Sequence, residues 1–393
     1  MSQPEVFIVS GARTPMGGLQ GSLSPMTAPQ LGTAAIAASL ERAAVDPSQI
    51  DEVFMGCVLP AGLKQAPARQ AAIGAGIPTS AGAVTVNKMC ASAMQATICA
   101  HDSIIAGTNN IAIAGGMESM SNAPHLVPGG RSGLRTGENQ MPDHMFIDGL
   151  EDAYTGRAMG SFAQETADQY GITREEMDDF AINSLKRAQA AMAAGQLAEE
   201  IVPVTVKTRR NETLVTEDEQ PLKANLEKIP TLRPAFAKDG TITAANASSI
   251  SDGASALVLA SGDALETQGL TPMAKIVAHS RHSQDPEEFT IAPIGAISKV
   301  LEKTGWMKDD VDLFEINEAF AMVTMLAIRE CGLDSEKVNI HGGACAQGHP
   351  IGSTGARIIV SLMHQLKQRG EKRGIAALCI GGGEATAVAI EMV

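Results

Sequence analysis

Two cysteines and one histidine in this sequence stand where reactive side chains are often placed. Cys90 follows an apolar run, Ala83–Asn87, and precedes a small-residue segment of helical composition. His349 lies in a glycine-rich turn, and Cys379 ends an apolar run that continues into three glycines. One thiol can carry an acyl group, the imidazole can take its proton, and the second thiol can act as a base. The set therefore suits carbon–carbon bond chemistry next to a thioester.

The position of Cys90 predicts a nucleophile. A helix is expected over about Cys90–Ala106, ending at Gly107. A helix N-terminus favours a thiolate, so we expect the pKa of this thiol to be lowered. Position alone leaves open a buried cysteine that only fills space, which is how Cys99 is interpreted. His101, on the same helix, is interpreted as a structural or surface residue rather than a base.

The C-terminal motifs supply the partners of this thiol. Pro350 keeps His349 in extended geometry before a helix that starts near Ser353, so His349 is expected to act as the base for Cys90. The glycines from Gly381 onward offer backbone N–H groups to a developing oxyanion. Asn317 falls where a strand gives way to a helix. It could cap that helix or position a water, and the pattern slightly favours capping.

Composition excludes several classes of function. The chain has 393 residues, which predicts two or three domains. Its net charge of −14 argues against a nucleic-acid binder, and no run of 18 apolar residues predicts a membrane span. Residues 1–5 lack the features of a targeting leader, so a cytoplasmic protein is expected. Cys345 and His349 could share a metal only with further ligands, which the nearby sequence lacks, so no metal is expected.

The order of apolar runs predicts an α/β fold with a sheet buried on both faces. Parts of the sequence also repeat. Val311–Ile316 resembles Ile50–Met55, and Ala376–Glu384 resembles Ile111–Glu118. The sequence therefore predicts a duplicated α/β unit. The strands expected in the first copy are Val6–Ser10, Glu52–Met55, Ala83–Asn87 and Ile111–Ala114.

The middle of the chain has a different character. Residues 120–249 carry segments rich in Pro, Gly and Ser, charge runs and one amphipathic helix. That helix is expected to begin at the capping box Thr173–Glu176 and to end at Gly195. We interpret this part as an insertion, after which the sheet resumes at Ala256–Ala260.

Six motifs in order along the chain carry a resemblance to a known family. The sequence resembles the thiolase family, in its acetyl-CoA acetyltransferase group, over essentially its whole length. The resemblance implies the thiolase fold: duplicated βαβαβαββ halves in α-β-α-β-α layers, with an inserted loop domain. The implied segments are residues 1–119 with 250–270, the loop domain 120–249, and residues 271–393. The matching motifs are Val86–Ser92, Gly115–Ser121, Thr243–Ser249 with Asp252–Gly253, Asn317–Phe320, Gly348–Gly352 and Cys379–Gly383.

The resemblance also implies a reaction, the reversible condensation of two acetyl-CoA molecules to acetoacetyl-CoA and CoA. Cys90 would carry the acetyl group after activation by His349, and Cys379 would remove the α-proton of the second acetyl-CoA. One oxyanion hole would combine His349 with a water held by Asn317. The other would use the N–H groups of Cys90 and Gly381. CoA thioesters are the substrates, and no cofactor is implied.

By the same resemblance the loop domain holds coenzyme A and helps to assemble the protein. Ser248 would contact the pantetheine, and Lys223 is a candidate for the adenine end. A homotetramer is implied, with the region Pro124–Gln140 in its contacts. Six residues would line the channel: Leu150, Met159, Phe236, Ala244, Ala319 and Phe320.

Four residues depart from the usual thiolase motifs and leave the acyl-chain preference open: Ala158, Phe289, Cys345 and Glu384. One alternative is a degradative 3-ketoacyl-CoA thiolase that takes longer chains. A decarboxylating ketosynthase would not need Cys379. A non-catalytic protein that binds acyl-CoA or lipid would not need Cys90, Asn317, His349 and Cys379 together.

Overall fold

The computed structural model describes residues 5–393. Residues 1–4 lie outside the described residues. They include the start of the predicted segment 1–119 and most of the residues on which the prediction about a targeting leader rests. The strands of the first half of the fold are β1 (Val6–Arg13), β2 (Gly17–Gly18), β3 (Glu52–Gly56), β4 (Gly82–Val86), β5 (Ile111–Ser119) and β8 (Ser251–Ser261). Those of the second half are β9 (Ala274–Ser283), β10 (Leu313–Ile316), β11 (Arg373–Ile380) and β12 (Glu384–Met392).

The two halves contain corresponding series of strands, which run in opposite directions along one sheet from a common centre. The sheet runs β10-β11-β12-β9-β1-β8-β5-β3-β4, with β2 paired to β8. Parallel pairing of β3 with β5 corresponds to that of β10 with β11, and antiparallel pairing of β5 with β8 corresponds to that of β11 with β12. This confirms the duplication. Only Phe7 and Ile8 of β1 pair with β9, so a short contact joins the two halves.

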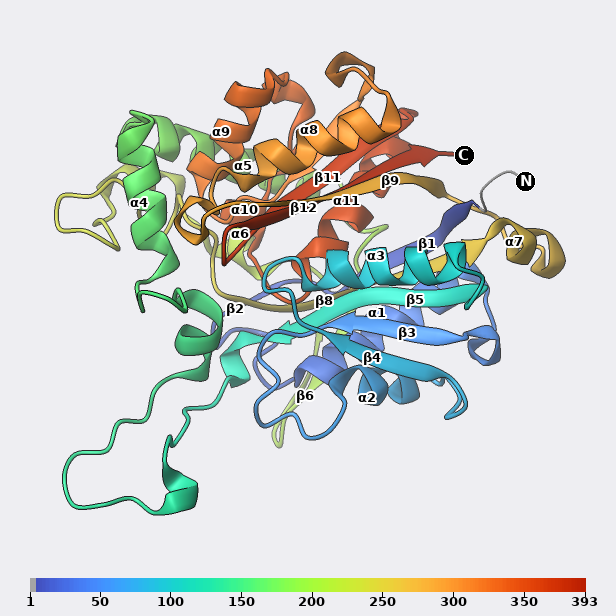
Figure 1. The fold of residues 1–393 in the computed structure, drawn as a ribbon, viewed down its shortest axis with the longest axis horizontal. Coiled ribbons are helices and arrows are strands. Elements are labelled where there is room, and N and C mark those ends of the chain that lie inside the picture. Colours follow the sequence, from blue (N-terminus) through green and yellow to red (C-terminus); the bar gives the residue numbers. More distant parts are fainter. Residues whose placement is uncertain (1–4) are drawn as a thin grey trace.

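Two helices lie between the halves and form the central layer, as Figure 1 shows for α3 beneath β12 and β9. They are α3 (Ser92–Ile105) and α11 (Thr354–Arg369), and each contacts strands of both halves. Their buried side chains, Met94 and Ile98 from α3 and Ile359 from α11 among them, form one core with both sheets. Helices α1 (Ala28–Ala43) and α2 (Pro67–Gly74) cover the outer face of the first half, and α8 (Ala292–Thr304) that of the second. This is the layered order expected of the thiolase fold.

The predicted elements lie close to the observed ones. Each of the four expected strands overlaps an observed one, although β1 and β5 run several residues further. The capping box is confirmed, because the Thr173 N–H donates to Glu176 Oε2 (2.7 Å) and the Glu176 N–H to Thr173 Oγ1 (3.2 Å). The remaining helices of the second half are α7 (Gly262–Gln268), α9 (Ala321–Cys331) and α10 (Ala344–Gln347). No helix in the described part of the chain is long and apolar enough to cross a membrane.

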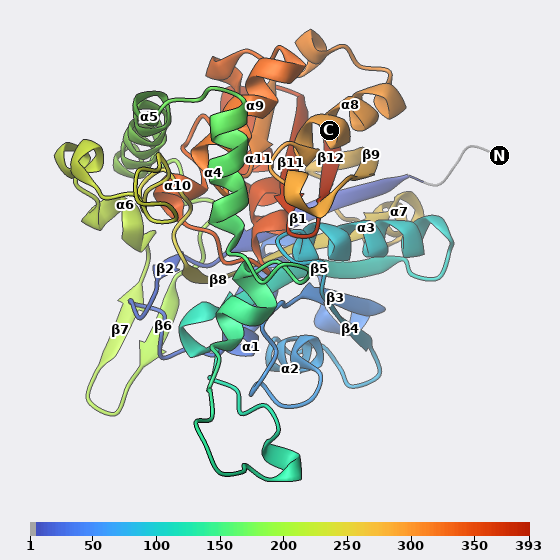
Figure 2. The same ribbon diagram turned by 60° about the vertical axis from the view of Figure 1, so that its left-hand side comes forward.

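The segment between β5 and β8 forms separate layers beside the sheet (Figure 2). A loop anchored by hydrogen bonds between Leu126 and Pro142 and between His144 and Pro124 projects from the body. The boundaries at 119, 250 and 270 stay predictions. The elements of this segment are α4 (Met159–Gln169), α5 (Arg174–Ala193), α6 (Glu219–Lys223) and the hairpin β6–β7 (Val204–Lys207 and Glu212–Val215).

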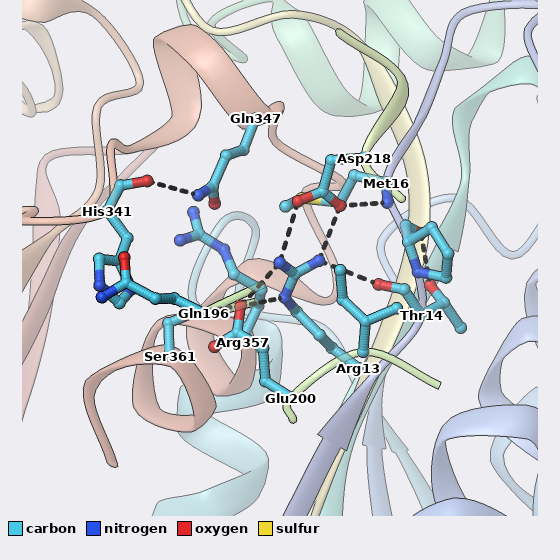
Figure 3. Close-up of polar contacts among 12 residues, drawn as sticks. Arg13, Thr14, Met16, Gln196, Glu200, Asp218, His341, Gln347, Arg357 and Ser361 are labelled. Atoms are coloured by element: carbon cyan, nitrogen blue, oxygen red, sulfur yellow. Dashed lines mark hydrogen bonds and ion pairs between the residues drawn. The ribbon is translucent and has the colours of Figure 1, made fainter. Parts of the chain in front are cut away.

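A buried ion cluster ties this segment to β1 (Figure 3). Arg13, fully buried at the end of β1, donates to Asp218 Oδ1 (2.7 Å) and Oδ2 (2.9 Å) and, from Nε, to Glu200 Oε1 (2.7 Å). Glu200 and Asp218 lie on either side of the β6–β7 hairpin. Because one guanidinium satisfies both carboxylates, the cluster fixes both ends of the hairpin against the sheet.

Candidate active site

A pocket of about 500 Å³ brings three of the predicted catalytic residues together. Cys90, His349 and Gly381 all line it. Cys90 comes from the loop between β4 and α3, and the other two come from loops of the second half. The pocket therefore lies where the two halves meet, and loops from both supply its reactive groups.

The backbone presents Cys90 through a tight turn. Helix α3 begins at Ser92, two residues later than expected, because Met89 adopts a left-handed conformation with φ of +46°. Ser92 holds this turn, since its hydroxyl accepts from the Lys88 N–H (2.9 Å) and donates to the Met89 carbonyl (2.7 Å). The loop thus directs Cys90 into the pocket.

The expected lowering of the Cys90 pKa was wrong. The residue is partly exposed to the pocket, yet protein atoms enclose its sulfur, and this burial raises the thiol pKa to about 11. Hydrogen bonds from the N–H groups of Gly381 and of Cys90 itself favour the thiolate, and the Glu118 carboxyl disfavours it. Desolvation outweighs the helix N-terminus here. A general base is therefore needed to ionise this thiol near neutral pH.

His349 has the tautomer and the protonation state of such a base. Its Nδ1 lies 2.6 Å from Thr354 Oγ1, and that hydroxyl donates to the Pro350 carbonyl (3.0 Å). Because the Thr354 hydroxyl gives its proton to the Pro350 carbonyl, it can only accept from His349. Nδ1 of His349 therefore carries the ring proton and donates it to Thr354, and Nε2 keeps its lone pair. Burial and the Arg357 charge lower the His349 pKa to about 3. The imidazole is neutral at physiological pH, and Nε2 has no partner among the described residues.

Two of the predicted catalytic residues, Cys379 and Asn317, are not among the residues that line the pocket. Cys379, the second-last residue of strand β11, is fully buried, and its burial and the neighbouring Cys90 raise its thiol pKa well above the usual value. Asn317, directly after β10, is buried, and neither its Oδ1 nor its Nδ2 has a partner among the described residues. It does not cap α9, whose N-cap residue is Phe320, so the capping interpretation was wrong. Both amide atoms remain able to hold a water.

The predicted substrate contacts divide into two groups. Lys223 lies outside the lining, 68% exposed in its side chain, and pairs with Glu219, so a role at the adenine end stays a prediction. The other seven line the pocket: Ser248, Leu150, Met159, Phe236, Ala244, Ala319 and Phe320. Gly160 permits this arrangement, since a Cβ at that position would collide with the Phe236 ring.

Of the four residues that depart from the family motifs, two line the pocket and two do not. Ala158 and Phe289 line the pocket, and the Phe289 ring packs against Phe320 with centroids 6.5 Å apart. Cys345 lies outside the lining against Glu318, where burial and that carboxyl raise its thiol pKa well above the usual value. Cys345 is therefore a poor nucleophile and a poor target for oxidation. Glu384 pairs with Lys88 at the edge of the site.

Sequence reasoning missed residues that hold the catalytic groups. Thr354 was assigned no role. A hydroxyl in the first helical turn after His349-Pro350 could have indicated a hydrogen-bond partner for the imidazole. Glu118 accepts the N–H groups of Val58 (2.9 Å) and Leu59 (3.1 Å), and burial raises its pKa to about 7. Glu318 accepts from Ser184 and from the Cys345 N–H, which fixes the turn before His349.

One group of side chains in the described residues has metal-ligand chemistry, and it lies away from the pocket. It comprises His101, Asp102 and His279. The two imidazoles lie 3.0 and 2.9 Å from the same Asp102 oxygen, so the group is already paired by direct hydrogen bonds. The expectation that the protein carries no metal stays a prediction.

Comparison with known proteins identifies the family. The thiolase N-terminal domain matches residues 6–263, and the thiolase C-terminal domain matches residues 270–392. This chain belongs to the thiolase family. This thiolase is 49% identical over 395 residues to the acetyl-CoA acetyltransferase of Schizosaccharomyces pombe, covering 100% of both chains. It is 46% identical over 389 residues to that of Cupriavidus necator, covering 98% of this chain and 99% of the other.

Solved structures of relatives share the fold. The crystal structure of the Acat5 thiolase from Ascaris suum in complex with coenzyme A matches with a TM-score of 0.94 and 41% identity, covering 99% of this chain and 100% of the other. The Bacillus anthracis acetyl-CoA acetyltransferase matches with a TM-score of 0.97 and 40% identity, covering 100% and 99%. The predicted fold class is thereby confirmed.

The protonation states of Cys90 and His349 give a pH prediction. With a thiol pKa of about 11, only about one Cys90 in 10⁴ is a thiolate at pH 7. We expect acetylation of Cys90 in His349→Ala to rise about tenfold per pH unit up to about pH 10, because only preformed thiolate reacts. The wild type keeps a neutral base throughout and should depend weakly on pH. Mass spectrometry of quenched mixtures measures both rates.

His125→Ala, which alters an exposed histidine on the projecting loop, is the matched control and should follow the wild type. Equal, pH-independent rates for His349→Ala and the wild type would contradict the assignment of His349 as the base.

Proposed function

We propose that this thiolase is an acetyl-CoA acetyltransferase, which condenses two acetyl-CoA molecules reversibly to acetoacetyl-CoA and CoA through an acetyl-Cys90 intermediate. The observation that carries the proposal is the convergence of Cys90, His349 and Gly381 on one pocket that Ser248 also lines. Relatives named acetyl-CoA acetyltransferase that match over nearly the whole chain support the choice of substrate. The relative solved with coenzyme A supports the binding of a CoA thioester.

The first half-reaction transfers the acetyl group to Cys90. Nε2 of His349 takes the thiol proton, and the sulfur attacks the thioester carbonyl carbon. The N–H groups of Gly381 and Cys90, which favour the thiolate in the free enzyme, then face the developing oxyanion. Burial keeps Cys379 protonated. As the carbon–sulfur bond to CoA breaks, Cys379 can give its proton to the departing CoA thiolate.

The second half-reaction forms the carbon–carbon bond. The Cys379 thiolate left by the first step removes the α-proton of a second acetyl-CoA and becomes a thiol again. Protonated His349, with a water on Asn317, stabilises the enolate oxygen. The carbanion attacks the acetyl-Cys90 carbonyl, and the departing Cys90 thiolate recovers its proton from His349. All protons are thus accounted for, and the enzyme returns to its starting state.

The pocket walls predict a preference for short acyl groups. Phe289 is buried and lines the pocket with Met159 and Phe320, and all three belong to the apolar cluster that also contains Cys379. We expect thiolysis to be fastest with the four-carbon substrate and at least about 100-fold slower at sixteen carbons, because each added methylene must displace these side chains. A series of 3-ketoacyl-CoA substrates from four to sixteen carbons measures this preference.

Phe289→Ala should extend activity to longer chains, while Phe146→Ala, at a more exposed part of the lining, should leave the profile unchanged. A wild-type maximum at long chains would instead support the degradative 3-ketoacyl-CoA thiolase. No thiolysis at any length would support a non-catalytic acyl-CoA or lipid-binding protein.

The proposal includes a homotetramer. The projecting loop supports it, because its apolar side chains Leu134 and Met141 are 53% and 65% exposed in the single chain and a second copy could bury them. The cytoplasmic location and the lack of a cofactor stay predictions.

A further inference from the structure

An ion pair joins the loop that carries Cys90 to the start of β12, next to the glycine turn Gly381–Gly383. Lys88 Nζ lies 2.6 Å from Glu384 Oε2, and the side chains are 21% and 33% exposed. Lys88 stands two residues before Cys90 in the nucleophile loop. Glu384 begins β12 directly after the turn Gly381–Gly383. The pair therefore links the first half of the fold to the second, at a residue two positions from Cys90 in the sequence.

Both partners are held by their own loops. The Lys88 N–H donates to Ser92 Oγ (2.9 Å), which also fixes the turn at Met89. Glu384 Oε1 accepts from Ser283 Oγ (3.1 Å), and the Glu384 backbone pairs with both Ser283 and Ile380. Because each side chain starts from a fixed backbone, the ion pair transmits position from one loop to the other.

The glycine turn carries the N–H group that this link would position. Gly382 and Gly383 adopt φ of +93° and +84°, and the Gly383 carbonyl accepts from the Gln284 N–H (2.8 Å). That anchor lies on the second half, whereas Gly381 lines the same pocket as Cys90, where its N–H group favours the Cys90 thiolate. Glycines carry no side chains that could hold this donor in place. Lys88 and Glu384 provide a side-chain connection between the loop that carries Cys90 and the strand that follows Gly381–Gly383.

We propose that Lys88 and Glu384 are positioning residues that hold the Gly381 N–H against Cys90 and so set the reactivity of its thiol. This role rests on the proposed function of Cys90 as the acetyl acceptor. Glu384, one of the departures from the family motifs, thus acquires a function. The pair acts through Gly381 and needs no contact with substrate.

The neutral double variant K88M/E384Q tests the proposal without changing the net charge. Losing the Gly381 donor should raise the pKa of Cys90 by about one unit, because a hydrogen bond to a charged group is lost, and slow its alkylation about tenfold. Iodoacetamide labelling of Cys90, followed by mass spectrometry from pH 7 to 11, measures both effects. Acetylation by acetyl-CoA should slow by a similar factor, with KM little changed.

The charge-swapped variant K88E/E384K should return alkylation to within about threefold of the wild type, because the ion pair is rebuilt. The matched control K207M/E212Q removes an exposed pair on the β6–β7 hairpin, 3.2 Å in length, and should change nothing. Alkylation of K88M/E384Q within twofold of the wild type overturns the proposal, as does a folded swap variant no faster than K88M/E384Q. If the wild type fails to acetylate, the proposed function is wrong, but the alkylation series still tests the positioning role.

Discussion

Replacing Cys90 with alanine is expected to abolish acetyl transfer. Among the residues that the structure describes, no other thiol lines the pocket. Cys90→Ala should therefore lower the exchange of acetyl groups between acetyl-CoA and free CoA by at least about 10⁴-fold, the scale seen when a nucleophile is removed. Labelled CoA measures the exchange, and intact-protein mass spectrometry should show no acetyl adduct. Binding of CoA should persist, because Ser248 and the apolar walls remain.

Cys99→Ala is the matched control for this variant. Cys99 lies on α3, the helix that follows Cys90, and is a free, partly buried thiol outside the lining. It should acetylate at the wild-type rate. Exchange that survives in Cys90→Ala would assign the nucleophile to another residue and would overturn the proposed reaction.

Replacing Cys379 with alanine should separate the two half-reactions. The variant keeps Cys90, His349 and Gly381, so Cys90 should still be acetylated to full stoichiometry, although more slowly because the proton donor to the departing CoA is lost. Condensation should fall at least about 10³-fold, because the proposed base for the α-proton is removed. Acetyl-enzyme that accumulates without acetoacetyl-CoA is the diagnostic result.

Stability should not confuse this test. Cys379 is fully buried, and a thiol-to-methyl change leaves a small void that costs about 1 kcal/mol. Cys331→Ala, a free and partly buried thiol in the last turn of α9, controls for loss of a cysteine and should condense normally. Normal condensation by Cys379→Ala would exclude Cys379 as the base.

Local sequence signals predicted much of this molecule. Glycines, prolines and capping residues depend on neighbours in the sequence, so the loops that carry Cys90 and His349 and the strand end that carries Cys379 were placed correctly. The start of α3 was misplaced because the left-handed Met89 depends on Ser92 and leaves no clear pattern.

Properties set by distant segments could not be predicted in the same way. The pKa of Cys90 follows from its burial in the folded chain, which outweighs the local effect of a helix N-terminus. The pairing of Lys88 with Glu384 spans 296 positions of the sequence. A single sequence gives no signal for such a contact.

The mirrored strand order has a consequence for how this enzyme can change. Neither half carries a complete reaction centre, since Cys90 belongs to one and Asn317, His349 and Cys379 belong to the other. The distances between them are set by the seam along which α3 and α11 pack. A substitution at that seam can thus disable chemistry without touching a reacting atom, and a compensating change can come from the opposite half. Catalytic turnover in this chain therefore also reports how accurately the two halves of the fold are packed against each other.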